Sequence, residues 1–466
     1  MERRKLVAFI IVVTVASVSV ASVLLYTGFF DSDYNHGPIR ITNDGEFTKE
    51  NGVTGGSGTE EDPYTIEGWR IGPSDFEQLG PEGAAVLIEG VSYHFVVRDI
   101  QITGPNTYGI MLDDVCNGTI EDSTFILCRW GAVLSDCSGC TVTRNNFTSC
   151  NAGMEISCLD TTAIEDNRFC REAEGYPVEP PLLGWGLRIG IEFRDVTISG
   201  NIFDGMSLEV SSLALPDDGS SSGLEITPDN LVNGDPVRFF EDQDNVTLHG
   251  SPAGQVIMFD CRDVVMSQLE ICQTGTAISL FRVDGCTITD CLLSNASAGM
   301  GSIFMKDSED VTIQSNYMSN GQVYLIKCSC IIFEDNIVSS SDHGLSLSEC
   351  DNVTIQGNIV QGCVHGMGLH GENFTVTGNI LQNNEYCLAV DGRDILIFLN
   401  DFIDNTHAGL IGNLRNVTFY SEAMGKGNYW SDYDGLDVDD DGIGDTPYAI
   451  ESNAQDDYPL MNPCNS

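Results

Sequence analysis

The chain has 466 residues, of which 42% are hydrophobic and 49 are glycine, a globular rather than a disordered composition. Its 69 acidic and 21 basic residues give a net charge of −48. Such a surface repels polyanions unless a metal ion bridges the two charges, so we expect no nucleic-acid partner. The acidity fits a salty exterior and equally an ordinary solvated surface.

Residues 1–30 predict a signal-anchor or transmembrane helix. Three basic residues, Arg3, Arg4 and Lys5, precede a run from Leu6 to Phe30 that carries no charge. A helix of that length would span about 37 Å, enough to cross a bilayer. Cleavage stays open, because small residues lie within the run. With either outcome, we expect the body of the protein at the cell surface or outside the cell.

Residues 31–95 lack the repeat that follows and predict an N-terminal cap with the first strands. From residue 96 to 425 one short phrase recurs with a period near 22 residues, as in Ile120, Val142 and Ile164. Such a period predicts a solenoid. Short runs of Val, Ile, Thr and Phe between turn residues predict an all-β, three-sided parallel β-helix with right-handed connections.

Two insertions, near 171–194 and 215–250, interrupt this predicted solenoid without ending it. The phrase repeats an asparagine, which we expect to form a hydrogen-bonded ladder at a turn between two sheets. The repeated asparagines include Asn316, Asn336, Asn358, Asn379 and Asn400.

The 17 cysteines also follow the repeat, since Cys116, Cys137 and Cys158 are 21 residues apart. Neighbouring coils of a solenoid are about 4.8 Å apart, within reach of a disulfide. Two interpretations therefore stay open: disulfides between coils outside the cell, or a ladder of buried thiols that fills the core.

Residues 426–466 predict an acidic C-terminal cap with a calcium loop. Asp437, Asp439 and Asp441 alternate before Gly442, as at the start of loops in which oxygen ligands converge on Ca²⁺. The twelfth position is Tyr448 rather than glutamate, so this is not an EF-hand, and Asp445 would close a shorter loop. The alternative is a solvated acidic turn.

One column of ring-bearing residues recurs at the start of a strand in each coil. Its members are Tyr108, Trp130, Trp185, His343, His365, Tyr386 and His407. Aromatic rings on a solenoid surface predict contact with sugar rings. The late histidines, with the stretch Cys363–His370, suggest copper as a second ligand. Met367, however, shares its column with core residues.

A third hypothesis is catalysis on a polysaccharide by a hydrolase, lyase or epimerase. Outward positions after the ring column include Glu155 and Arg188, with Glu192 and Arg194 nearby, and later Ser346, Gly368 and Ala389. A glycosidase needs two carboxylates that face each other across a sugar, and no such pair is evident. We therefore lean away from an enzyme.

The chain resembles the NosD-like or CASH-type β-helix family, which is common among archaeal surface proteins. The resemblance rests on Gly56–Tyr64, on Val232–Pro236 followed by Ala253–Val256, on the asparagine-bearing coils, and on Gly427–Tyr433 with Asp456–Leu460. It implies a right-handed β-helix, a carbohydrate interaction and, through the NosD name, a link to copper-site assembly. We thus expect a structural or carbohydrate-binding protein whose partners are glycans or cell-envelope polymers.

Overall fold

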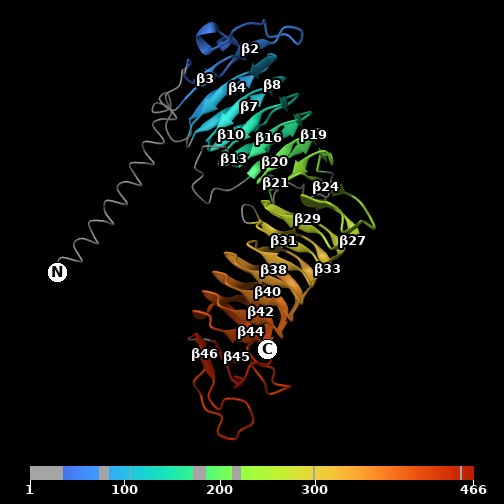
Figure 1. Cartoon of the computed structure of the whole chain (residues 1–466), viewed down its shortest axis with the longest axis vertical. Coiled ribbons are helices and arrows are strands. Elements are labelled where there is room, and N and C mark those ends of the chain that lie inside the picture. The colour runs from blue at the N-terminus through green and yellow to red at the C-terminus, as the bar shows by residue number, and fades with distance from the viewer. Residues whose placement is uncertain are drawn as a thin grey trace, which may run out of the picture.

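The computed structural model describes residues 35–72, 83–104, 107–171, 185–211, 222–296, 300–451 and 454–465. They form a parallel β-solenoid of about 14 turns, with about 22 residues per coil, as the repeat predicted. Figure 1 shows two successive stacks of strands, one from β4 to β21 and one from β29 to β44, that meet near β24. We call residues 39–232 the first segment and residues 235–430 the second segment.

The first segment has three sheets of short parallel strands. Its first sheet contains β1 (Ile39–Ile41), β4 (Ala84–Val91), β7 (Tyr108–Val115), β10 (Trp130–Ser135), β13 (Ala152–Ser157), β17 (Trp185–Ile189) and β21 (Ser207–Val210). Its second contains β2 (Tyr64–Glu67), β5 (Phe95–Arg98), β8 (Gly118–Glu121), β11 (Thr141–Thr143), β15 (Ala163–Glu165), β19 (Val196–Ser199) and β22 (Leu224–Ile226). Its third contains β3 (Arg70–Ile71), β6 (Gln101–Thr103), β9 (Thr124–Ile126), β12 (Asn146–Thr148), β16 (Arg168–Cys170), β20 (Ile202–Asp204) and β23 (Leu231–Val232).

In the second segment two of the three sheets merge along the solenoid. They begin as the separate strands β24 (Asp235–Glu241), β26 (Gln255–Phe259), β29 (Thr276–Phe281), β32 (Gly301–Lys306) and β35 (Val323–Ile326), and β25 (Thr247–His249), β27 (Arg262–Ser267), β30 (Asp284–Thr289), β33 (Glu309–Gln314) and β36 (Ser329–Glu334). They continue as the long strands β38 (His343–Gln356), β40 (His365–Thr377), β42 (Tyr386–Phe398) and β44 (His407–Thr418). The third sheet contains β28 (Glu270–Cys272), β31 (Leu292–Ser294), β34 (Tyr317–Ser319), β37 (Ile337–Ser339), β39 (Ile359–Gln361), β41 (Ile380–Gln382), β43 (Asp401–Ile403) and β45 (Tyr429–Trp430).

Short elements complete the ends and one loop. They are the 3₁₀ turns η1 (Asp44–Glu46) and η2 (Lys49–Asn51), the pair β14 (Leu159–Asp160) and β18 (Phe193–Arg194), and the hairpin β46 (Tyr448–Glu451) with β47 (Ala454–Asp456). The predicted anchor, residues 1–30, lies outside the described residues. Among the described residues, no helix is long and apolar enough to cross a membrane.

Repeated inward residues build the core by stacking on their own copies. In the first segment, the rings of Phe125 and Phe147 stack with centroids 4.8 Å apart, and Phe169 and Phe203 continue the stack. In the first segment, the glycine that follows a ring at the start of a strand makes room for the phenylalanine stack. A Cβ on Gly131 would lie 2.3 Å from the Phe147 ring, so only glycine fits there.

Buried asparagines form the predicted ladder. Each side-chain amide Nδ2 donates to the Oδ1 of the next asparagine at 2.9–3.1 Å. The ladders comprise Asn145, Asn167, Asn201 and Asn230 in the first segment, and Asn316, Asn336, Asn358, Asn379, Asn400 and Asn428 in the second. The buried carboxylate of Asp456 ends the second ladder by accepting from Asn428 and from Trp430 Nε1.

The last coil of the first segment packs against the outer face of the second segment. The chain reverses in the antiparallel hairpin of β23 and β24, where Asn233 and Gly234 both have positive φ. Beyond it, the outward residues Phe259, Phe281 and Phe304 belong to the same buried cluster as the core of the first segment. The outer face of the second segment therefore covers the open end of the first. The predicted interruption near 215–250 includes this joint.

Candidate functional site

A concave surface lies on the outer face of the second segment, beside the joint. Ser346, Gly368 and Ala389 occupy one outward column on three successive long strands, and Tyr324 lies above them in the same column. Phe304 precedes Tyr324 in this column and is buried at the joint. Tyr324 is large, and the three residues that follow it in the column are small. We call the resulting hollow the groove, and Tyr324, Ser346, Gly368 and Ala389 are among its lining residues.

Polar side chains form one margin of the groove. His370 and Asp391 are register partners on β40 and β42, and both line the groove. A second hollow continues from them to Glu372, Arg393 and further polar residues. Glu372 and Arg393 form an ion pair there. This margin offers both hydrogen-bond donors and acceptors.

Three late members of the predicted ring column lie on the same strands as Ser346, Gly368 and Ala389, three residues before them. We call those three small residues the floor of the groove. The rings of His343, His365, Tyr386 and His407 stack in that order, with centroids 4.7, 5.2 and 4.7 Å apart and interplanar angles of 14–26°. We call these four residues the ring ladder. Because each ring covers its neighbour's face, the ladder presents ring edges along its length. Burial is the main cause that lowers the pKa of His343, and the charge on His365 adds to it.

The ring ladder does not fit one copper ion. A metal ion bound to an imidazole nitrogen lies in the plane of that ring, and stacked rings have nearly parallel planes that share no such point. Met367 is buried in the core, and Cys363 is only 3% exposed. Within the described ranges, three potential ligand side chains converge only at Asp437, Asp439 and Asp441.

The early part of the ring column belongs to the first segment, so the structure divides the predicted column in two. Tyr108 and Trp130 are register partners, and Ala152 separates Trp130 from Trp185 in the same column. The two indole centroids are 6.1 Å apart and tilted by 38°. The guanidinium of Arg188 lies over the Trp185 ring, 5.0 Å from its centroid, so a cation already covers part of this surface.

Of the four residues considered for catalysis, the structure brings two together. Arg188 Nη1 donates to Glu155 Oε1 at 3.0 Å, from register positions on β17 and β13. Arg194 pairs with Asp160 on the separate pair of β14 and β18, and Glu192 lies in the turn before β18 with a φ of 57°. The Glu155 carboxylate is thus held by an arginine.

The sequence analysis missed the carboxyl group that neighbours this pair. Glu209 is the register partner of Arg188 on β21, and it is only 3% exposed. Burial raises the pKa of Glu209 to about 7, despite a hydrogen bond from Thr276 and the nearby charge of Arg188. Residues 207–210 read as an ordinary strand in the sequence. Nothing near them predicts the burial of Glu209, because the residues that cover it lie more than 60 positions downstream.

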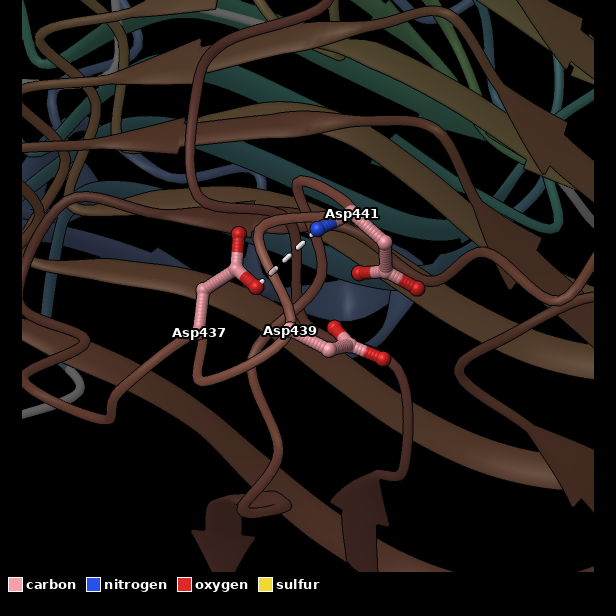
Figure 2. Close-up of side chains that lie close together, drawn as sticks. All are labelled: Asp437, Asp439 and Asp441. Atoms are coloured by element: carbon pink, nitrogen blue, oxygen red, sulfur yellow. Dashed lines mark hydrogen bonds between the residues drawn. The ribbon is translucent and has the colours of Figure 1, made fainter.

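The acidic loop of the C-terminal cap brings its carboxylates together. Potential ligand oxygens of Asp437, Asp439 and Asp441 lie within 4.8 Å of one another, and Figure 2 shows the three side chains on a single loop. Asp437 accepts from the backbone nitrogens of Asp441 and Gly442, at 3.1 and 2.8 Å. Asp445 accepts from Val438 N at 2.6 Å, which closes the loop.

This closeness has an electrostatic cost. The charge of Asp441 is the main cause that raises the pKa of Asp439, and Asp445 and Asp437 add to it. Binding of a hard cation would relieve the repulsion between these carboxylates, and carboxylate oxygens are the ligands that Ca²⁺ prefers. The structure thus brings three of the predicted ligand residues together on one loop.

Eleven of the 17 cysteines are buried. Neighbouring coils do bring thiols into contact: the thiols of Cys128 and Cys150 interact, as do those of Cys328 and Cys350.

Comparisons with known proteins match both segments. A family model described as "Right handed beta helix region" matches residues 84–235, and one described as "Periplasmic copper-binding protein (NosD)" matches residues 229–435. The two matches meet at the hairpin of β23 and β24, where the segments join. A probable ABC transporter binding protein NosD from Pseudomonas aeruginosa is 47% identical over 58 residues, which is 11% of this chain and 14% of that protein.

Solved structures with similar coils have low identity. The tailspike protein of E. coli bacteriophage HK620, solved with a hexasaccharide, is 11% identical with a TM-score of 0.30, over 76% of this chain and 67% of that one. The A-module of the Azotobacter vinelandii mannuronan C-5 epimerase AlgE6 is 10% identical with a TM-score of 0.24, over 75% and 90% of the two chains. The two family models and the partial match together identify the chain as a NosD-like right-handed β-helix protein.

Proposed function

We propose that this protein acts outside the cytoplasm as a β-helix that binds carbohydrate in the groove of the second segment. The observation that carries the proposal is the change along one outward column, from Phe304 under the joint to the small residues Ser346, Gly368 and Ala389 in the open. Three successive coils thereby leave a floor that is wide enough for a chain-like ligand. The description of the matched family as periplasmic supports the location.

The margins of the groove favour a polyhydroxylated ligand. His370 and Asp391 lie on one side of the groove, so a ligand on the floor would meet hydrogen-bonding groups there. The net charge of −48 repels polyuronates and other polyanions. We therefore propose a neutral polysaccharide of the cell envelope or its surroundings.

The test fills the floor without disturbing the core. A Cβ on Gly368 would have Ser346 Oγ as its nearest neighbour, at 3.5 Å, which is an ordinary van der Waals contact. Gly368→Leu therefore adds a side chain to the groove lining without a clash at its first atom. Thr375 lies further along the same strand and is not among the residues that line the groove, so Thr375→Leu is the matched control.

The binding proposal predicts that affinity for a neutral polysaccharide, found on a glycan array and measured by calorimetry, falls at least about tenfold in Gly368→Leu, because the side chain occupies the ligand's place. Thr375→Leu should keep wild-type affinity. Equal affinity in both variants would exclude the groove, and a polyuronate bound more tightly than neutral chains would contradict the electrostatic argument.

The enzymatic alternative has a separate test at Glu155. Its carboxylate is paired with Arg188, and the neighbouring Glu209 is buried, so these two carboxylates do not face each other openly across a sugar. We expect no reducing sugar to be released from polysaccharides by the wild type. Release that Glu155→Gln abolishes would replace the binding proposal with an enzyme.

We also propose that the acidic loop binds Ca²⁺ and thereby orders the C-terminal cap. The converging oxygens of Asp437, Asp439 and Asp441, with Asp445 closing the loop, support this role. Copper delivery through the ring ladder, the alternative that the family name suggests, has no support from the ring geometry.

A further inference from the structure

The joint between the segments closes an open sheet edge with side chains. β21 is the last strand of the first sheet, so its outer edge would leave backbone groups unpaired. The side-chain amide of Gln255, which is fully buried, takes the place of a next strand. Gln255 Nε2 donates to Leu208 O at 2.6 Å, and Leu208 N donates to Gln255 Oε1 at 3.2 Å. Gly275 N donates to Ser207 Oγ at 3.0 Å.

Glu209 lies at the centre of this contact. Its side chain projects outward from the first segment, and β29 of the second segment packs against β21. Thr276 Oγ1 donates to Glu209 Oε2 at 2.8 Å and accepts from Met300 N at 2.8 Å. The carboxyl group is thereby enclosed between the two halves of the molecule.

Among the described residues, the charge that acts on Glu209 is that of Arg188, which belongs to the first segment. Arg188 on β17 is its register neighbour, and Glu155 on β13 already holds that guanidinium at 3.0 Å. The described second-segment residues that contact β21 through hydrogen bonds, Gln255, Gly275 and Thr276, carry no charge. The positive charge available to an ionised Glu209 would therefore be that of Arg188, which already pairs with Glu155.

We propose that the joint is a pH-sensitive hinge, in which protonated Glu209 lets the segments pack tightly and ionised Glu209 loosens the contact. The proposal stands on the enclosure of this carboxyl group at the interface, and it does not depend on carbohydrate binding. Ionisation would leave a charge with two neutral donors, Thr276 Oγ1 and the Met300 backbone nitrogen, in a site from which water is excluded.

The direction of the effect follows from the two protonation equilibria. Burial raises the pKa of Glu209 from 4.5 to about 7, so the closed joint holds its proton over a range in which the opened, solvated group has lost it. The contact is most stable below pH 4.5 and weakens as the pH rises toward 7 and beyond. Between pH 6 and pH 8, these values make opening of the joint about tenfold more favourable.

Thermal unfolding across pH tests the hinge. Wild type, Glu209→Gln and Glu225→Gln would be compared at pH 6, 7 and 8. Glu225 lies exposed on β22, the last strand of the second sheet of the first segment, so its variant controls for the loss of one acid. The proposal predicts that Tm falls with rising pH in wild type and in Glu225→Gln, and that Glu209→Gln loses most of this fall. A fall in Glu209→Gln equal to that of wild type would overturn the hinge.

Hydrogen exchange on the unmodified chain gives a second measurement that needs no variant. Amide protection of 207–210 and 274–278 would be measured at pH 6 and pH 8, corrected for intrinsic exchange, and compared with that of the distal strand 380–382. We expect protection at the joint to fall about tenfold more than in the distal strand. Equal changes in both places would overturn the hinge whatever the variants show.

Discussion

The two segments use the same repeat for the core and different solutions for the outer face. In the first segment, stacked phenylalanines fill the interior and its outward Arg188 bonds to Glu155. In the second segment, the outward column of Ile257, Ser279 and Phe304 is buried at the joint and continues through Tyr324 as the floor of the groove. One face of a sheet is thus interior over some coils and open surface over the next.

The comparison shows where a solenoid has freedom. Inward residues stack on copies of themselves about 4.8 Å away, so one unsuitable residue disturbs its neighbours on both sides. Outward residues meet solvent or another part of the chain, and their identities follow from that partner. The ladder ends differ as well: Asn230 ends the first ladder beside the joint, whereas Asp456 ends the second within the cap.

The largest effect should come from the end of the second ladder. Asp456→Ala would leave the Asn428 amide donors and Trp430 Nε1 without their buried acceptor. We expect a loss of roughly 3–5 kcal/mol in the free energy of unfolding, measured with urea, because buried donors without partners are costly. Asp456→Asn keeps one acceptor oxygen and should lose less. An Asp456→Ala variant as stable as wild type would refute the capping role.

A pair of glycine variants compares the interior of one segment with the surface of the other. A Cβ on Gly131 would lie 2.3 Å from the Phe147 ring, whereas a Cβ on Gly368 would have its nearest neighbour at 3.5 Å. We expect Gly131→Ala to cost about 1–3 kcal/mol of unfolding free energy and Gly368→Ala to change it by less than about 0.5 kcal/mol. Equal costs would mean that the two faces are packed alike.

Removal of calcium should have a smaller effect, confined to the cap. If the loop holds Ca²⁺, a chelator lowers Tm by roughly 2–4 °C in wild type, because a ligand that binds only the folded form stabilises it. Asp439→Asn should have a lower calcium affinity and respond less to the chelator. A wild-type Tm that is unchanged by chelator would remove calcium from the cap.

The smallest expected effect is that of copper on the ring ladder. Since stacked imidazoles do not share a binding point, His365→Ala should titrate copper with the same affinity as wild type. Calorimetry with Cu²⁺ and Cu⁺ checks this. A drop of tenfold or more in His365→Ala would show that the ladder opens to bind metal.

Much of the fold was predictable because the repeat specifies contacts between its own copies. The period near 22 residues predicted the parallel coils, and the repeated asparagines predicted ladders that continue through Asn316, Asn336 and Asn358. The spacing of Asp437, Asp439 and Asp441 predicted their convergence, because all three lie on one short loop. Local spacing suffices where the partners are close in sequence or related by the repeat.

The tertiary structure alone decided how outward residues are used. The predicted ring column is divided between the two segments, because the first segment ends on the face of the second. The late rings stack on one another, so their faces are covered. Glu209 became buried because Thr276, 67 positions away, covers it. The repeat determined the interior through short-range stacking, whereas the groove and the joint depend on packing between distant segments, which no period in the sequence records.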